Sequence, residues 1–556
     1  MSNTQKETEI YEKLATIFDG EIDRSIPTRD FYSHDASMFE IMPGAVAFPK
    51  NSKSIQKLVG FVNDHKKYFP KLSITARSAG TDMTGGAIND SIIIDMTKHF
   101  DKTIKVDSDS AQVLPGRHYR DFEKDTLKHG LLLPSFPASR ELCTVGGMVA
   151  NNSGGEKSLE FGKTEKFVKQ LKVVFSDGKE YTVKPLTYAQ LKKKMAQKDF
   201  EGRIYREVFE LVDEHYDVIK LAKPHVSKDS TGYHLWNVWD RETKIFDLTQ
   251  LIVGSQGTLG IVTDIEFRLI KNPKHSGSLI IFLDSLDTLG EVINNVLTHK
   301  PATFEGFDNY TLMLSFKLFF FFHKTLGWWG MIKLGIQLIP SLLAFRRGIP
   351  KMVLIAQFTG DSNEEVAQRV HQLRLDMREF GHDAIFEEDE TEEQEKKFLI
   401  MRRESFSLLR NKVKDKHTAP FIDDLVVPPE HLPEFLPKLR VILKKYKLLA
   451  TIAGHMGDGN FHVIPLMRFE DEKERRKIEP CMQEVNALVL KYGGSMSGEH
   501  NDGMTRGPWL KQQYSPQMMA HFRKAKHIFD PDNIFNPHKK TDSDWDYSMA
   551  HLRQHF

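Results

Sequence analysis

The pattern of apolar and polar positions gives the first half of the chain short strands and helices separated by glycine-rich loops. Helical spacing of apolar residues at 54–65 and 205–218 predicts two helices. Four short β-branched runs bounded by turn residues predict strands at 92–96, 171–175, 251–254 and 261–267. The pattern therefore predicts an α+β domain whose loops carry the glycines, and it contains no repeat of fixed period.

The second half begins with strand-like alternation at 279–284 and helical spacing at 285–297. An acidic, helix-prone stretch at 387–397 is predicted to form a solvated helix face without a function of its own. The polar residues 541–556 are typical of either a tail or a docking helix.

Residues 312–347 form an unusual segment rich in Phe, Trp and Lys, and no acidic residue occurs between Asp308 and Asp361. Lysines and Pro340 interrupt its apolar runs, so it is too broken for a transmembrane helix of about 20 apolar residues. Basic residues interleaved with Trp and Phe favour a helix lying at a membrane surface. The alternative is a buried helical hairpin whose lysines extend to solvent.

Length and charge narrow the possible classes of protein. A chain of 556 residues suits two or three packed domains. Its net charge of +1 gives no reason to expect a nucleic-acid partner. The only cysteines, Cys143 and Cys481, argue for a reducing compartment and against an iron–sulfur cluster held by this chain, which would need about four thiolates. The polar N-terminus resembles no targeting signal, so we expect the protein on the cytosolic side.

Three glycine-rich stretches are the first candidates for a binding site: RSAGTDMTGG within 74–90, TVGGMVANNSGG within 134–164, and GSQGTLGIVT within 254–269. The first follows a predicted strand, and its glycines permit the backbone to approach a phosphate closely. It lacks the ending of a Walker loop and is not a GxGxxG fingerprint. By itself such a loop is more often a simple turn, but three of them favour a shared ligand.

The order of these stretches resembles the FAD-binding domain of the vanillyl-alcohol-oxidase/PCMH flavoproteins. Within that superfamily the chain resembles the branch of D-lactate dehydrogenases, D-2-hydroxyglutarate dehydrogenases and the flavin subunit of glycolate oxidase. The resemblance implies a two-lobed PCMH-type FAD-binding domain at 1–270 and an antiparallel-sheet cap domain at 271–540, with its last segment returning to the flavin and 541–556 as a tail. It places the flavin at the junction of the two domains.

In this family the first loop binds pyrophosphate, and the other two hold the ends of the flavin nucleotide through backbone groups. The first loop has no histidine, so we expect FAD to be bound noncovalently. The family commonly has Glu where this chain has Gln256, which weakens one expected contact. The resemblance implies that these residues bind FAD: Arg77, Ser78, Ala79, Gly80, Thr81, Asp82, Thr84, Gly85, Pro137, Thr144, Gly146, Gly147, Asn151, Ser153, Gly154, Gly155, Gly257, Gly260, Ile261, Val262 and Asn536.

The last third of the chain carries the strongest chemical signal. AGHMGDGNFH supplies His455 and His462 on a glycine-rich turn, and SGEHNDG supplies Glu499 and His500. Two imidazoles and a carboxylate suit Zn²⁺ or Mn²⁺ with coordination positions left for substrate. These motifs match the family's GHxGDGNxH and GEH, which implies His455, His462 and Glu499 as metal ligands and His500 as proton acceptor. The family commonly has Gly where this chain has Asn501, which we expect to narrow the pocket or alter substrate choice.

Two further residues follow from the family resemblance. FLIMRRESF resembles the family's Arg-Glu helix and implies that Arg403 binds the substrate carboxylate, although Arg402 and Arg403 also balance the acidic stretch upstream. FDPDNIFNPHK resembles the family's closing motif, with His538 in place of Gly, and implies that Asn536 contacts the flavin region.

These features together indicate an FAD-dependent dehydrogenase that oxidises a D-2-hydroxy acid to the 2-oxo acid. D-lactate is the first choice, ahead of glycolate and D-2-hydroxyglutarate. The predicted electron acceptor is a quinone, a cytochrome or a separate iron–sulfur subunit, reached by contact with the inner face of a membrane. Two other classes remain open: a non-redox FAD transferase of the alkylglycerone-phosphate-synthase kind, and a noncatalytic flavin-binding subunit. The intact histidine motifs argue against both.

Overall fold

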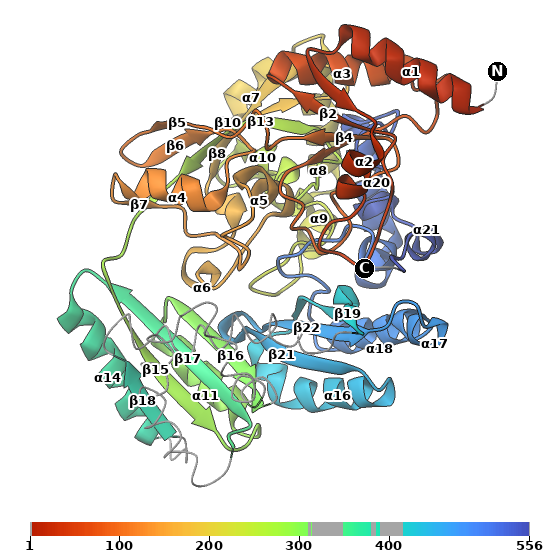
Figure 1. The fold of residues 1–556 in the computed structure, drawn as a ribbon. Coiled ribbons are helices and arrows are strands. Elements are labelled where there is room, and N and C mark those ends of the chain that lie inside the picture. Colours follow the sequence, from red (N-terminus) through yellow and green to blue (C-terminus); the bar gives the residue numbers. More distant parts are fainter. Residues whose placement is uncertain (1–2, 310–312, 314–348, 380–384, 390–414, 555–556) are drawn as a thin grey trace.

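The computed structural model describes residues 3–309, 313, 349–379, 385–389 and 415–554. Nearly all of the predicted membrane-contact segment and Arg403 lie outside these residues. The described chain forms an upper body, which contains the N-terminal half and the C-terminal helices, and a lower body built on one large sheet (Figure 1).

The first lobe of the upper body is a four-stranded sheet in the order β1-β2-β4-β3. Its strands are β1 (Gly20–Asp23), β2 (Ala45–Pro49), β3 (Ile74–Arg77) and β4 (Ile92–Asp95). The predicted strand at 92–96 is confirmed as β4, which pairs in parallel with both neighbours and is buried along its whole length. Such burial on both faces explains its run of three isoleucines. Helices α1 (Asn3–Ile17) and α3 (Ser52–His65) pack side by side on this lobe.

The second lobe is an antiparallel sheet in the order β5-β6-β13-β8-β9. Its strands are β5 (Thr103–Val106), β6 (Ser110–Val113), β8 (Val168–Val174), β9 (Glu180–Val183) and β13 (Ile261–Arg268). The predicted strands at 171–175 and 261–267 correspond to β8 and β13. The predicted helix at 205–218 is divided into α8 (Phe200–Glu214) and α9 (Tyr216–Leu221) at His215.

The strand predicted at 251–254 is wrong, because the chain forms the short helix α10 (Thr249–Ile252) there. The side chain of Asp247 accepts hydrogen bonds from the amide and hydroxyl of Thr249, 2.9 and 2.6 Å away, at the first turn of α10. An apolar run of four residues does not by itself distinguish a buried strand from a buried helix.

The lower body is an antiparallel sheet in the order β18-β15-β17-β16-β21-β22-β19, with β20 also paired to β22. Its strands are β15 (His275–Leu283), β16 (Thr303–Asp308), β17 (Met352–Gly360), β18 (Ile385–Asp389), β19 (His417–Thr418), β20 (Leu425–Val426), β21 (Leu449–His455) and β22 (Asn460–Met467). Four long helices pack beside the sheet: α11 (Leu289–Thr298), α14 (Asn363–Glu379), α16 (Leu432–Lys445) and α18 (Ile478–Lys491). This sheet is the predicted cap.

Two sequence-based expectations for the lower body change. Residues 387–389 belong to strand β18 rather than to a solvated helix, because they pair with β15 from Ser278 to Ile280. The rest of the predicted acidic helix lies outside the described residues. The predicted strand at 279–284 is confirmed within β15, and the predicted helix at 285–297 begins later, at Leu289.

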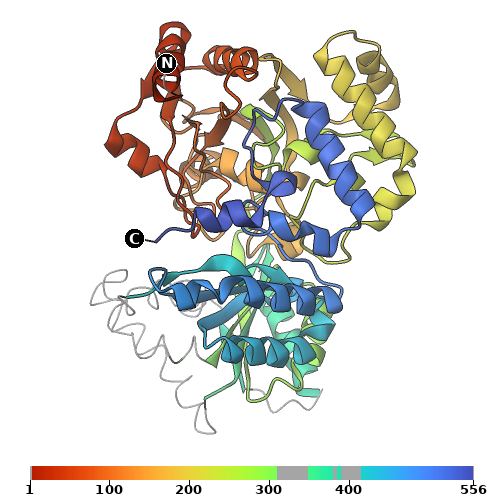
Figure 2. The same cartoon turned by 90° about the vertical axis from the view of Figure 1, so that its right-hand side faces the viewer.

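The C-terminal segment leaves the cap and returns to the upper body (Figure 2). Helix α20 (Pro516–Phe529) packs against α8, and α21 (Trp545–Ala550) follows it. The ring of Trp545 lies 5.2 Å from that of Trp509, and Leu552 pairs with Phe39. The last described residues therefore form a docking helix rather than a free tail. Among the helices of the described ranges, none is long and apolar enough to cross a bilayer.

Candidate functional site

A cavity of about 1340 Å³ lies between the two bodies and is lined by all three glycine loops and by the histidine motifs. Its walls include fifteen of the residues predicted to bind FAD: Ser78, Ala79, Gly80, Thr81, Asp82, Pro137, Thr144, Gly146, Gly147, Asn151, Ser153, Gly154, Gly257, Gly260 and Val262. His455, His462, Glu499 and His500 line the same cavity. The structure thus brings together two groups of residues that are separated by up to about 400 positions in sequence.

Small residues in the second loop are required by close packing. A Cβ atom on Gly155 would lie 2.1 Å from the carbonyl oxygen of Phe136, and one on Gly146 would lie 2.6 Å from that of Pro115. Gly147 and Gly257 are different, since a Cβ there would meet no atom closer than 3.6 Å. Both line the cavity, so their backbones are exposed to whatever occupies it.

Six predicted FAD residues do not line the cavity: Arg77, Thr84, Gly85, Gly155, Ile261 and Asn536. Asn536 holds two loops together, because its Nδ2 donates to the carbonyls of Gly86 and Gln256 at 2.8 and 2.7 Å. Its Oδ1 accepts a hydrogen bond from Thr75 at the end of the first lobe. Asn536 therefore positions the first and third loops.

Gln256 adds a second link between these loops. Its Nε2 donates to Thr84 Oγ1 at 3.1 Å, and its Oε1 accepts from the amide of Gly503 at 2.8 Å. Thr84 in turn donates its hydroxyl hydrogen to Asp82 at 2.9 Å. A glutamate at position 256 would offer Thr84 no donor, whereas the amide donates to Thr84 and accepts from Gly503 at the same time.

The two other departures from the family pattern occupy left-handed backbone positions. Asn501 has φ 69° and His538 has φ 62°. The side chain of Asn501 donates to the carbonyls of Gly254 and Asn151 at 2.9 and 3.2 Å and does not line the cavity. The expectation that Asn501 narrows the pocket is therefore wrong. Its amide instead satisfies buried carbonyl groups of the second and third loops.

The hairpin of β21 and β22 positions two of the histidines. In its register His462 lies opposite Ala453, and His455 lies opposite Asn460. Gly459 turns the chain at φ 64°, where a Cβ would lie 1.8 Å from the carbonyl oxygen of Val427. The two imidazole rings consequently lie 5.4 Å apart at their centroids.

His455 is also a cross-strand neighbour of Glu305 on β16. The Nδ1 atom of His455 is 2.6 Å from Glu305 Oε1, which leaves Nε2 directed to Glu499 Oε1 at 3.3 Å. Glu305 is fully buried, and sequence reasoning missed it. The available signal was an acid between two phenylalanines in the middle of the strand TFEGFD.

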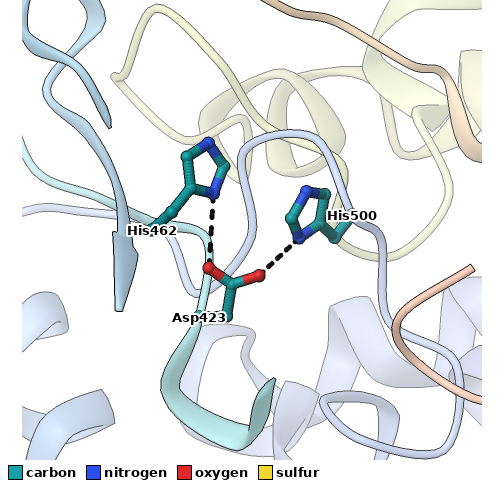
Figure 3. Close-up of side chains that lie close together, drawn as sticks. All are labelled: Asp423, His462 and His500. Carbon is teal, nitrogen blue, oxygen red and sulfur yellow. Dashed lines mark hydrogen bonds and ion pairs between the residues drawn. The ribbon is translucent and has the colours of Figure 1, made fainter. Parts of the chain in front are cut away.

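Asp423 connects the other two histidines (Figure 3). Its Oδ1 is 3.3 Å from His462 Nδ1, and its Oδ2 is 2.7 Å from His500 Nδ1. The second contact has the distance of an ion pair but not the alignment of a hydrogen bond. The rings of His462 and His500 are stacked with their centroids 5.1 Å apart.

Asp424 fixes the backbone of the GEH motif. Its carboxylate accepts hydrogen bonds from the amides of Glu499 and His500 at 2.9 and 2.7 Å and from the hydroxyl of Ser497 at 2.7 Å. Asp423 and Asp424 were not identified from the sequence, because they lie far from both histidine motifs. Paired acids in the apolar run FIDDLVV were the only indication.

Lys228 lies beneath the cluster and is 1% exposed. Its Nζ is 2.6 Å from Glu499 Oε1 and 3.1 Å from Asp458 Oδ2, and it also donates to the carbonyl of Gly155 at 3.2 Å. A buried cation paired with two buried acids compensates part of their charge.

The electrostatics of the cluster are dominated by buried acids: Glu305, Asp423, Asp424, Asp458 and Glu499. Burial alone would lower the pKa of His500, but Asp424 and Asp423 outweigh it and raise the pKa to about 9. Burial also opposes the shift at Glu499, yet Lys228 and His455 hold its pKa well below the usual range.

The sequence-predicted ligand trio converges. One ligand atom from each of His455, His462 and Glu499 lies within 4.8 Å of the others. Ligand atoms lie within the same distance of one another in two overlapping groups. The first is Asp423 with His462 and His500, and the second is Asp424 with Glu499 and His500.

Similarity to known proteins agrees with this architecture. Residues 43–184 match an FAD-binding domain, and residues 272–540 match the C-terminal domain of FAD-linked oxidases. In solved structures, p-cresol methylhydroxylase superposes with a TM-score of 0.67 at 16% identity, covering 98% of both chains. Alkyldihydroxyacetonephosphate synthase superposes with a TM-score of 0.65 at 17% identity, covering 95% of this chain and 85% of that one. These structures show a shared fold.

Curated relatives carry several names. D-2-hydroxyglutarate dehydrogenase of Pseudomonas putida is 26% identical over 94% of this chain and 50% of its own length, so this chain spans about half of that relative. Glycolate oxidase subunit GlcD of Bacillus subtilis is 25% identical over 93% of both chains. D-lactate dehydrogenase of Anaerostipes hadrus is 25% identical over 91% of this chain and 92% of its own length. The chain therefore contains an FAD-binding domain followed by the C-terminal domain of FAD-linked oxidases.

Proposed function

We propose that the chain binds FAD noncovalently in the central cavity and oxidises a D-2-hydroxy acid to the 2-oxo acid. One observation carries this proposal: the glycine loops and the cluster of His455, His462, Glu499 and His500 line one continuous cavity. A flavin held by the loops would therefore reach a substrate held by the cluster. Pockets at domain junctions are a usual place for such ligands.

The same cluster fits a divalent metal, for which we propose His455, His462 and Glu499 as ligands and Zn²⁺ or Mn²⁺ as the ion. Two neutral imidazoles and a carboxylate are suitable donors, and their ligand atoms are close enough to share one ion. Buried carboxylates that outnumber the adjoining Lys228 and Arg506 also favour a cation at this place.

When bound, the metal would supply a Lewis acid for the substrate hydroxyl and FAD would supply a hydride acceptor. The protein must then hold the substrate and remove the hydroxyl proton. His500 is our proposed proton acceptor, since Asp423 engages its Nδ1 and leaves Nε2 for the substrate. A divalent cation at the cluster would offset the buried carboxylates that raise the pKa of His500, and would so favour the neutral ring that can accept a proton. Asp424 fixes the backbone of the same residue through its amide. Binding of the substrate carboxylate by Arg403 stays a proposal based on sequence alone.

For the substrate, D-lactate is the first choice from sequence, with glycolate and D-2-hydroxyglutarate as alternatives. Relatives of about 25% identity carry names of all three kinds.

The proposed electron acceptor is a quinone, a cytochrome or a separate iron–sulfur subunit. Contact of residues 312–347 with an anionic membrane remains a proposal as well. Binding of the protein to anionic liposomes that weakens with salt, and is lost when 312–347 is deleted, would support it.

The proposal is tested by adding 2-hydroxy acids to the purified yellow protein without oxygen. We expect at least one D-2-hydroxy acid to bleach the flavin, and His500→Ala to retain FAD while slowing the bleaching by about 10²–10⁴-fold. Acid denaturation should release the FAD into solution. A wild-type protein whose flavin is not reduced by any such acid would refute the proposal.

A further inference from the structure

Lys157 is an unpaired cation in the wall of the cavity. The lysine and arginine side chains in the described part of that wall are Arg140, Lys157 and Lys274. Arg140 pairs with Glu123 at 3.0 Å, and Lys274 is exposed. Lys157 is half-buried, and among the described residues no ion pair or hydrogen bond involves its amine. Burial lowers the pKa of Lys157 while Glu156 and Glu160 oppose that shift, so the amine lies in a partly desolvated place.

The turn that carries Lys157 is attached to the histidine and carboxylate cluster. The amide of Ser158 donates to the carbonyl of Gly155 at 3.0 Å, and Lys157 has φ −85° and ψ 0°. These values make Lys157 the third residue of a type I turn. The carbonyl of Gly155 also accepts a hydrogen bond from Lys228, the partner of Glu499.

Contacts on either side of Lys157 place it beside the cluster. A Cβ on Gly154 would lie 3.3 Å from Glu499 Oε1, and one on Gly457 would lie 2.7 Å from the side chain of Leu159. Three residues of chain span at most about 11 Å, so the Lys157 backbone stays close to Glu499. Lys157 lines the same cavity as His455 and Glu499, so its amine is available to an anionic group on a molecule that occupies this cavity.

We propose that Lys157 binds a second carboxylate of the substrate, beyond the 2-hydroxy acid group, and so makes the enzyme selective for 2-hydroxy dicarboxylic acids. The inference rests on the proposed function. A half-buried ammonium without a partner gains a charge-assisted hydrogen bond from a second carboxylate and gains nothing from a methyl or hydrogen at the same place.

The test compares D-2-hydroxyglutarate, a dicarboxylic acid, with D-lactate, a monocarboxylic acid, on the FAD-loaded enzyme. Lys157→Met should lower the ratio of kcat/KM for D-2-hydroxyglutarate over D-lactate by about 10–100-fold, mainly through KM. Lys157→Arg should restore most of the ratio. Lys274→Met, the same change on an exposed residue of the same wall, should leave the ratio as in wild type.

A binding measurement separates this inference from the proposed function. Titration of the oxidised enzyme with 2-oxoglutarate and pyruvate, followed by the flavin spectrum, requires no turnover. Lys157→Met should weaken binding of 2-oxoglutarate much more than binding of pyruvate, even if neither hydroxy acid reduces the flavin. The role of Lys157 would be overturned if the variant lost the same affinity for both ligands or lost its bound FAD. It would also be overturned if the wild-type protein bound neither ligand.

Discussion

His500 and Asp423 form a contact of 2.7 Å between Nδ1 and Oδ2, although they are separated by 77 residues in sequence. This contact orients the imidazole and leaves Nε2 toward the cavity. Asp423→Asn should retain FAD but slow flavin reduction by about 10–100-fold, because a neutral amide neither orients the ring nor stabilises its protonated form as well.

Stopped-flow flavin reduction in the absence of oxygen measures this effect. Asp415→Asn provides a matched control, since Asp415 is an exposed acid that pairs with Arg468 at the surface. If Asp423→Asn reduces its flavin at the wild-type rate, Asp423 does not position His500.

The buried pair of Lys228 with Glu499 should be important for stability as well as for the site. Lys228→Met leaves Glu499 and Asp458 without their cation, and removal of one member of a buried pair costs about 3–5 kcal/mol. Lys169→Met breaks an exposed pair of similar length, 2.7 Å, and should cost less than about 1 kcal/mol.

Chemical unfolding in the presence of a chelator measures the free energy of unfolding of both variants. Added Zn²⁺ or Mn²⁺ should return part of the stability to Lys228→Met, because a cation at the cluster compensates the same acids. If Lys228→Met and Lys169→Met lose the same free energy of unfolding, the buried pair is no more important for stability than the exposed one.

The histidine motifs could be found in the sequence because their residues are close together along the chain, whereas the acids that support them are distant in sequence. His455 with His462, and Glu499 with His500, each lie within one glycine-rich stretch, so short spacing revealed them. Glu305 and Asp423 join them only through the pairing of β16 with β21 and the path of the chain before β20. Such contacts depend on sheet register, which no local pattern of this chain specifies.

The fold was predictable to a similar extent. Long or strongly patterned elements such as α3 and β13 followed from periodicity, whereas α10 was mistaken for a strand because four apolar residues fit both structures. The family resemblance supplied the two-domain arrangement. It also led to a wrong expectation at Asn501, whose side chain bonds the loops rather than facing the cavity.

Asn536 should control flavin affinity without touching the cavity. Asn536→Ala removes hydrogen bonds to Gly86 and Gln256 and leaves both buried carbonyls without this donor. We expect FAD to bind about 10–100-fold more weakly, as measured by reconstitution of the apoprotein. Asn533 lies three residues before Asn536, and Asn533→Ala removes only an exposed hydrogen bond to Asp542, so this variant should bind FAD normally. Equal affinities in the two variants would show that Asn536 does not position the loops.

Asp35 should make stability depend on pH. Burial, with a smaller effect of Asp82, raises the pKa of Asp35 to about 7. The folded state therefore holds this proton more tightly than the unfolded state, whose Asp has a pKa of about 3.9. The resulting stability is fully present below about pH 4 and is lost as the pH rises through about 7, at no more than about 1.4 kcal/mol per pH unit.

Asp35→Asn removes this titration. Its free energy of unfolding relative to wild type should increase between about pH 5 and pH 7 and then level off. Asp64→Asn, at an exposed position, should show a constant difference over the same range. A constant difference for Asp35→Asn would mean that Asp35 is already ionised in the folded protein at pH 5.

The central claim is that a 2-hydroxy acid bound at the His455 and His500 cluster gives its C2 hydrogen to a flavin held by the glycine loops. Its most direct test is the rate of flavin reduction in a single anaerobic turnover with the D and L forms of a 2-hydroxy acid and with the D form deuterated at C2. We predict that the D form reduces the flavin much faster than the L form and that deuterium slows the reduction. Flavin that stays oxidised with every 2-hydroxy acid, or a rate that ignores the configuration and isotope at C2 under conditions where reduction itself is limiting, would contradict the account.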